Sequence, residues 1–161
     1  MKRILNVTVL TLTAFILLGT VSVMAVERPI ALNARGIATF ITDEAGNPIR
    51  ANVSSSGTAT HLGLTTTVGT ITFSPDPANP GRLLTSGTGT MTGANGDMVQ
   101  LELNGALVLT PGSTTATDKF VINFVGGTGR FAGAHGTGTG IVVVNLLTGA
   151  FEITIVGDID F

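Results

Sequence analysis

The stretch GGTGRFAGAHGTGTG, residues 126–140, decides how the rest of the sequence is interpreted. Nearly half of its residues are glycine, and only Arg130, Phe131 and His135 carry large side chains. Four kinds of segment have this composition: a phosphate-binding loop, a calcium-binding repeat, a flexible linker and a turn within a folded sheet. The residues within and around the stretch distinguish these alternatives.

The first three alternatives lack residues that they need. A phosphate-binding loop requires a Lys-Ser/Thr pair and a helix after the glycines, and neither follows residue 140. A calcium-binding repeat requires an aspartate where Arg130 stands, and a linker would not hold Phe131 between two apolar segments. The stretch is therefore predicted to be a tight hairpin with a bulge, in which Gly126, Gly127 and Gly129 make the turn and Phe131 anchors it on the sheet.

Apolar and polar residues alternate along most of the chain after residue 35, with a period of two that is typical of β-strands. The segment MVQLELNGALVL, residues 98–109, is the clearest case, and FEITIVGDIDF at residues 151–161 repeats the pattern. In the first segment one face is predicted to carry Val99, Leu101, Leu103, Leu107 and Leu109, and the other Gln100, Glu102 and Asn104.

Turn residues divide this part of the chain into eight short segments. The predicted strands are 36–42, 49–60, 64–73, 83–91, 98–109, 119–126, 133–144 and 150–159. Because the connections are short, neighbouring strands are expected to be antiparallel and in up-and-down order. Eight such strands close into a small barrel whose interior holds side chains or one small ligand. The predicted fold class is all-β, an eight-stranded antiparallel up-and-down β-barrel.

The N-terminal segment has the features of a secretory signal peptide. Lys2 and Arg3 precede an apolar segment that ends in the small-residue cleavage site Val23-Met24-Ala25. The domain prediction is a signal peptide at 1–25 and a single barrel domain at 26–161. We expect export to the periplasm or the extracellular space, with no stable membrane insertion after cleavage. A retained membrane anchor is the alternative, and the polar residues within the apolar segment disfavour it.

Charge and cysteine content exclude several function classes. After residue 25 the chain has six basic and ten acidic residues without charge runs, so it lacks the basic patch of a nucleic-acid-binding protein. The absence of cysteine excludes disulfides, zinc thiolates and a cysteine nucleophile.

Few residues are candidates for chemistry. His61, Arg130 and His135 are weak ligand-binding candidates, and Glu102 and Arg50 are the other polar residues considered. The two histidines have no third ligand at metal-site spacing, so no metal site and no cofactor are predicted. A structural role for His61, with its imidazole hydrogen-bonded to the backbone of a turn, is the favoured interpretation. No catalytic residue is identified.

Two separated motifs carry a resemblance to a known superfamily. GGTGRFAGAHG, which starts at residue 126, resembles the GGTGxFRxARGYA signature of plant dirigent proteins and a turn of exported bacterial proteins with allene oxide cyclase-like barrels. GTATHLG at residues 57–63 resembles a second motif of that bacterial group. The resemblance implies an eight-stranded antiparallel barrel and a homo-oligomer, often a trimer. The structural turn motif consists of Gly126, Gly127, Thr128, Gly129, Phe131 and Gly133.

The departures from the dirigent signature concern function. Ala132, His135 and Thr137 stand where dirigent proteins have two arginines and a tyrosine, and the chain contains no tyrosine. The expected function is therefore that of an exported, non-catalytic barrel module, which has a structural role or binds a small apolar ligand. One alternative is a cyclase-like or dirigent-like enzyme that acts in the barrel cavity. A second is a small outer-membrane β-barrel, because the chain ends in Phe161 after alternating apolar residues.

Overall fold

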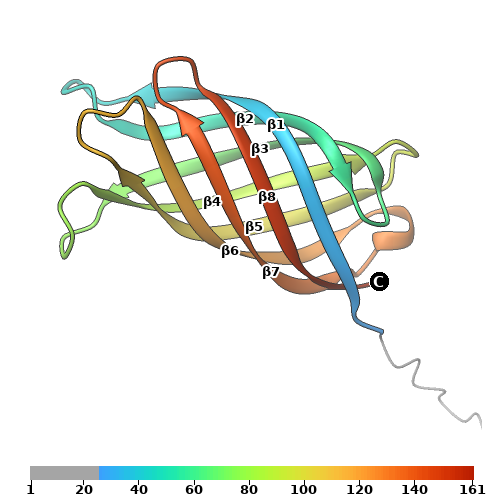
Figure 1. The fold of residues 1–161 in the computed structure, drawn as a ribbon. Helices are drawn as coiled ribbons and strands as arrows, with labels where there is room; N and C mark the ends of the chain where they lie inside the picture. Colours follow the sequence, from blue (N-terminus) through green and yellow to red (C-terminus); the bar gives the residue numbers. More distant parts are fainter. Residues whose placement is uncertain (1–25) are drawn as a thin grey trace, which may run out of the picture.

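The computed structural model describes residues 26–161, and the predicted signal peptide lies outside them. The chain forms one closed sheet (Figure 1). Its strands are β1 (Arg28–Thr42), β2 (Pro48–Ala59), β3 (Gly63–Pro75), β4 (Arg82–Gly93), β5 (Met98–Leu109), β6 (Thr115–Gly127), β7 (His135–Asn145) and β8 (Ala150–Asp160). Each strand pairs antiparallel with the next, which confirms the predicted all-β, up-and-down barrel of eight strands.

The first and last strands close the barrel. β1 pairs with β8 in continuous antiparallel register, from Arg28 opposite Ile159 to Ile37 opposite Ala150. Every strand therefore has two neighbours, so the sheet has no free edge with unpaired N–H and C=O groups.

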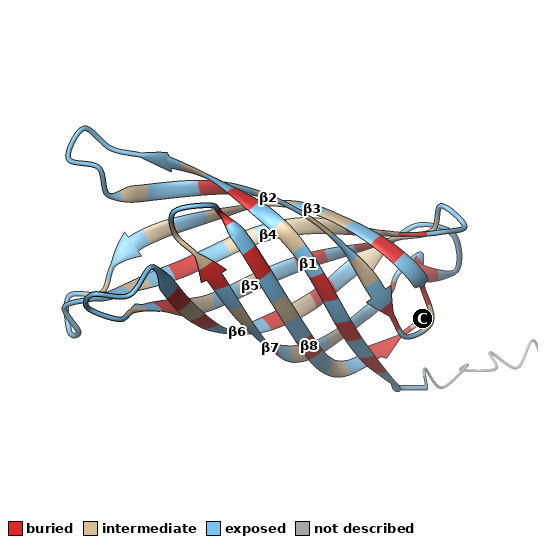
Figure 2. Ribbon diagram, turned by 45° about the horizontal axis from the view of Figure 1, so that its top comes forward, coloured by how far each residue is buried: buried red, intermediate tan, exposed pale blue. Residues whose placement is uncertain are grey.

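More buried and more exposed residues alternate along the strands (Figure 2), as expected where successive side chains point into and out of the barrel. On β5, Val99 and Leu101 are buried, whereas Gln100 and Glu102 are exposed, as the period of two predicts. Apolar side chains occupy the inner face of the barrel. The outer face carries most of the threonine and charged side chains.

The starts of three strands differ by two or more residues from those predicted, and β3 and β4 each end two residues later than predicted. β1 begins at Arg28 and not at residue 36, because Ile30, Leu32 and Ala34 continue the buried alternation toward the N-terminus. β6 begins at Thr115 and not at residue 119, and β7 begins at His135 and not at residue 133. Pairing with neighbouring strands determines where these strands start. The polar residues at the starts of β1 and β6 interrupt the apolar pattern, so the sequence predicted later starts.

The segment that follows β6 is not the tight hairpin expected. Residues 128–134 form a longer connection that contains one turn of 3-10 helix, η1 (Gly129–Phe131). A bulge lies within β6, just before this stretch and not inside it as predicted: Gln100 pairs with Gly126 and Leu101 with Phe124, so Val125 is the extra residue.

The two ends of the barrel are built from different turns. The "motif end" contains the β2–β3, β4–β5 and β6–β7 connections and both ends of the described chain, and the "distal end" contains the other four connections (Figure 1). Two core clusters of buried side chains fill these ends separately. No helix within residues 26–161 is both long and apolar enough to cross a membrane.

Phe131 is the largest fully buried side chain of the barrel, with an exposed fraction of 0%. It packs in the cluster of the motif end, where its ring centroid lies 4.5 Å from that of Phe161. The turn motif therefore closes this end of the barrel with an aromatic side chain.

Replacement of Phe131 by alanine is expected to lower the free energy of unfolding by about 3–5 kcal/mol, because it leaves a cavity in a packed core. The measurement is chemical denaturation of the Phe131→Ala variant. Leu147→Ala serves as the control: Leu147 is 80% exposed, and its loss should change stability by less than about 0.5 kcal/mol. Equal effects of the two substitutions would contradict the anchoring role of Phe131.

Candidate functional site

A cavity of about 120 Å³ lies inside the barrel. All eight strands contribute to its lining, which is almost entirely apolar: Leu32 and Phe40 from β1, Leu101 and Leu103 from β5, and Ile155 from β8 are examples. Two of the inward positions on β3 and β4, Gly69 and Gly89, carry no side chain. Packing is therefore incomplete at this level of the barrel, and the space that remains is the candidate functional site.

Asp118 on β6 is the one ionisable residue among the described residues that line the cavity. Its exposed fraction is 5%, and its neighbours on the inner face of the same strand, Ala116 and Phe120, are buried apolar residues. In the register it lies opposite Leu107 of β5 and Val142 of β7. The carboxyl group is therefore held inside an apolar barrel.

Burial raises the pKa of the Asp118 carboxyl above its ordinary value of 3.8. The nearby Thr85 hydroxyl and the Ala106 backbone N–H oppose this shift, but burial is the larger effect. Lys119, which follows Asp118 in the chain, is exposed on the outer face. Within residues 26–161, Asp118 takes part in no ion pair.

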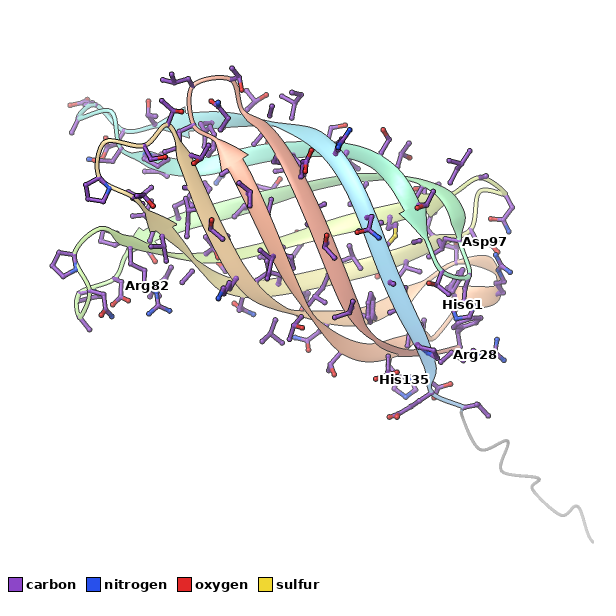
Figure 3. The ribbon with its side chains drawn as sticks, in the orientation of Figure 1. Arg28, His61, Arg82, Asp97 and His135 are labelled. Carbon is purple, nitrogen blue, oxygen red and sulfur yellow. The ribbon has the colours of Figure 1, made fainter. Side chains whose placement is uncertain are left out.

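The three ligand-binding candidates predicted from the sequence, His61, Arg130 and His135, lie at the motif end and do not line the cavity. Figure 3 shows His61 and His135 at this end, together with Arg28 and Asp97, whereas Arg82 lies at the distal end. The structure thus brings His61 and Arg130 together, but it does so outside the cavity.

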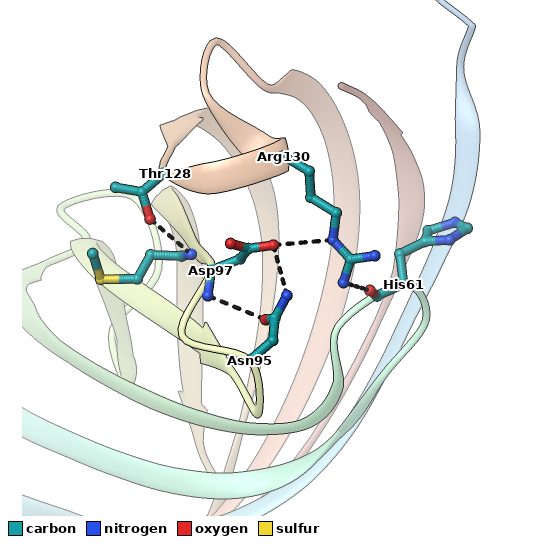
Figure 4. A network of polar contacts seen from close by, with 6 residues as sticks. His61, Asn95, Asp97, Thr128 and Arg130 are labelled. Carbon is teal, nitrogen blue, oxygen red and sulfur yellow. Dashed lines mark hydrogen bonds and ion pairs between the residues drawn. The ribbon is translucent and has the colours of Figure 1, made fainter.

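Arg130 joins three turns of the motif end (Figure 4). Its Nη2 donates a hydrogen bond of 2.6 Å to the carbonyl oxygen of His61, and its Nε lies 3.1 Å from Oδ2 of Asp97. Asn95 Nδ2 donates to the same Asp97 oxygen at 2.8 Å, and the Met98 N–H donates to the Thr128 hydroxyl. These contacts tie η1 to the β2–β3 and β4–β5 turns.

Gly129 allows this arrangement. Its φ of +60° lies in the left-handed region, and a Cβ at this position would overlap the Asp97 carboxylate. Both the backbone conformation and the close approach of Asp97 therefore require glycine at the first residue of η1.

His61 has a structural environment. It adopts φ of 68° in the β2–β3 turn, and its Nε2 lies 3.1 Å from the carbonyl oxygen of Pro29. Its ring packs edge-on against Phe161, with centroids 5.5 Å apart, and the Arg28 guanidinium lies 4.5 Å from the same Phe161 ring. The imidazole therefore contacts the backbone of strand β1, and not that of a turn as was predicted.

The other polar candidates lie on the surface. His135 is at the start of β7, and its Nε2 lies 3.3 Å from Oδ2 of Asp160. Glu102 and Arg50 are exposed on the outer faces of β5 and β2. Among residues 26–161 no group of three His, Asp or Glu side chains is arranged to hold a metal ion.

The distal end is less tightly closed than the motif end. Phe40 and Phe73, whose ring centroids are 6.0 Å apart, line the cavity but are only half-buried. Two of the turns beyond them are held by aspartate hydrogen bonds, since Asp43 accepts from the Asn47 N–H at 2.8 Å and Asp76 from Asn79 Nδ2 at 2.9 Å. These bonds lower the pKa of both aspartates.

Sequence reasoning missed Asp118, because the sixth strand was predicted to begin one residue later. Aspartate is depleted in strands and common in turns, so it was assigned to the preceding loop. The signal that could have found it is the alternation of Phe120, Ile122 and Phe124, which places Asp118 on the same inner face when it is continued by one step.

Comparisons of the chain with protein-family models, with curated proteins and with solved structures find no match. The candidate site therefore rests on the residues of this chain alone.

Replacement of Asp118 by asparagine is expected to stabilise the barrel increasingly as the pH rises above 3.8. An aspartate whose pKa is higher in the folded than in the unfolded state binds more protons when folded, so its contribution to stability falls as pH rises toward the folded pKa. Below pH 3.8 the Asp118 carboxyl is protonated in both the folded and the unfolded state, so the substitution should add little stability through the shifted pKa. The measurement is thermal unfolding of both proteins from acidic to neutral pH.

Asp158→Asn is the matched control, because Asp158 is exposed on the outer face of β8. The change in stability caused by Asp158→Asn should not increase with pH as the change caused by Asp118→Asn does. A stability difference between wild type and Asp118→Asn that is constant with pH would contradict the shifted titration.

Proposed function

We propose that this barrel is a non-catalytic binding module that holds one small apolar molecule in its interior. The observation that carries the proposal is the cavity of about 120 Å³ with its apolar lining, enclosed by a complete ring of strands. Apolar cavities of similar size, about 150 Å³, stay dry and bind benzene. Burial of an apolar ligand there would remove its surface from water without the loss of protein hydrogen bonds.

The size of the cavity limits the ligand. Pockets for drug-sized ligands usually measure about 300–1,000 Å³, so this cavity suits a single ring or a short alkyl chain. The half-buried Phe40 and Phe73 make the distal end the favoured entrance, because Phe131 and Phe161 fill the motif end.

The enzyme alternative has less support. Acid–base catalysis in such a cavity would use at least one well-placed titratable group and commonly a second. Among the described residues that line the cavity, Asp118 is the one such group, and the histidines and Arg130 lie elsewhere. A binding role needs no further group and is therefore preferred.

The outer-membrane alternative predicts an apolar outer band that faces lipid. Charged residues on the outer face argue against it: Arg35 of β1 and Glu152 of β8 form an exposed cross-strand ion pair of 2.9 Å, and Glu102 and Lys119 are exposed in β5 and β6. The same face also exposes apolar side chains, such as Val68, Val121 and Val156, but its charged residues support a barrel surrounded by water.

The proposal also includes export to the periplasm or the extracellular space, which is inferred from residues 1–25. It further includes membership of the dirigent-like superfamily, whose members are often homo-oligomers.

Toluene is a suitable probe of the cavity, because it is apolar and comparable in size to benzene. We expect it to bind the wild-type protein and to shift the NMR resonances of methyl groups that line the cavity, such as those of Leu103 and Val142. The Ser55→Leu substitution fills space at a lining position and should weaken toluene binding at least about tenfold.

Ser54→Leu is the matched control. Ser54 precedes Ser55 on β2 but is exposed on the outer face, so the same substitution should leave binding unchanged. Far-UV circular dichroism and thermal unfolding of each variant establish that the barrel is intact. If toluene does not bind the folded wild-type protein, or if both variants bind it equally well, the proposed function is wrong.

A further inference from the structure

Two polar atoms on the inner face of the barrel lack partners. Oδ1 of Asp118 and Oγ1 of Thr85 are fully buried and have no hydrogen-bond partner within residues 26–161. Buried polar groups are normally hydrogen-bonded, and one that is not lowers the stability of the fold. A fully buried carboxyl oxygen without a partner, on a residue that lines an otherwise apolar cavity, therefore needs an explanation.

Gly105 brings these two groups near each other. Thr85 of β4 lies opposite Gly105 of β5, and a Cβ at Gly105 would lie only 2.7 Å from Oδ1 of Asp118. Because the glycine has no side chain, the Asp118 carboxyl on β6 extends over β5 toward β4. The carboxyl is thus placed by the fold at one side of the cavity, with Leu107 and Phe120 beside it.

The rest of the lining determines what kind of group can meet this carboxyl. Besides Asp118, the polar residues that line the cavity are Ser55, Thr67 and Thr88, and the Thr88 side chain is on the outer face. The other residues of the lining are apolar. A net charge would be poorly solvated in such a cavity. A hydroxyl group is neutral, and it can donate to a carboxylate or accept from a protonated carboxyl. It therefore complements Asp118 in either protonation state.

We propose that Asp118 is the polar anchor of the ligand site, and that the ligand is a small apolar alcohol whose hydroxyl binds the Asp118 carboxyl while its hydrocarbon part fills the apolar cavity. This inference rests on the proposed function, because it names the class of ligand that the same cavity takes. Thr85 lies near the carboxyl but is not part of the cavity lining.

The test compares toluene, benzyl alcohol and benzylamine, which share a ring and differ in the polar group. Dissociation constants are measured by NMR titration for the wild-type protein and for Asp118→Leu, which removes the carboxyl. We expect the substitution to weaken benzyl alcohol relative to toluene by at least about tenfold. Asp118→Asn keeps a hydrogen-bonding group and should retain most of the relative affinity for the alcohol.

Asp158→Leu is the matched control, since it makes the same change on the outer face and should leave all three affinities unchanged. If toluene binds, but the ratio of its affinity to that of benzyl alcohol is the same in wild type and Asp118→Leu, the inference is overturned. A buried water that hydrogen-bonds to the carboxyl would then explain Asp118 instead. Tighter binding of benzylamine than of benzyl alcohol by the wild type would also overturn it, because Asp118 would then select a cation. If none of the three probes binds, the proposed function itself fails. If Asp118→Leu does not fold, Asp118→Ala removes the carboxyl in its place, and the same loss of at least about tenfold for benzyl alcohol relative to toluene is expected. An unchanged ratio in Asp118→Ala would overturn the inference.

Discussion

The pairing of β1 with β8 is the contact on which the rest of the barrel depends. It gives the sheet two defined surfaces, one enclosed and one exposed, so that each residue on a strand has an inner or an outer position. The apolar side chains of one face then bury each other, and no strand is left with unpaired backbone N–H and C=O groups that could pair with another chain. The cavity exists because this closed ring is slightly wider than the side chains that fill it at the level of Gly69 and Gly89.

The two ends of the barrel have separate roles that follow from their residues. At the motif end, Phe131 fills the opening and Arg130 fastens three turns over it, so this end serves stability. At the distal end the aromatic side chains are half-buried and the turns are short loops held by aspartates. The glycine-rich motif therefore stabilises one end of the barrel, whereas the candidate site lies at its middle.

The sequence was sufficient to predict the number, order and direction of the strands, because alternation with a period of two is a local property. It was also sufficient for the inner and outer faces of β5, where Val99 and Leu101 alternate with charged and amide residues. It was not sufficient for Asp118. A carboxylate inside a barrel opposes local propensity, so the start of the strand was predicted after Asp118, and the pairing of β6 with β5 and β7 includes it. His61 and Arg130 stood out in the sequence because they are rare polar residues within conspicuous motifs, yet their partners are backbone carbonyls and a turn aspartate.

The closing pair of strands also has a consequence for how the chain folds. Seven of the strand pairings join neighbours in sequence, so they can form as successive hairpins, but Arg28 meets Ile159 only when almost the whole domain has been synthesised. The entropy of closing so long a loop makes non-local β pairing slow. An open, curved sheet with two unpaired edges is thus the expected intermediate, and its lifetime would set the time during which the chain needs protection from aggregation.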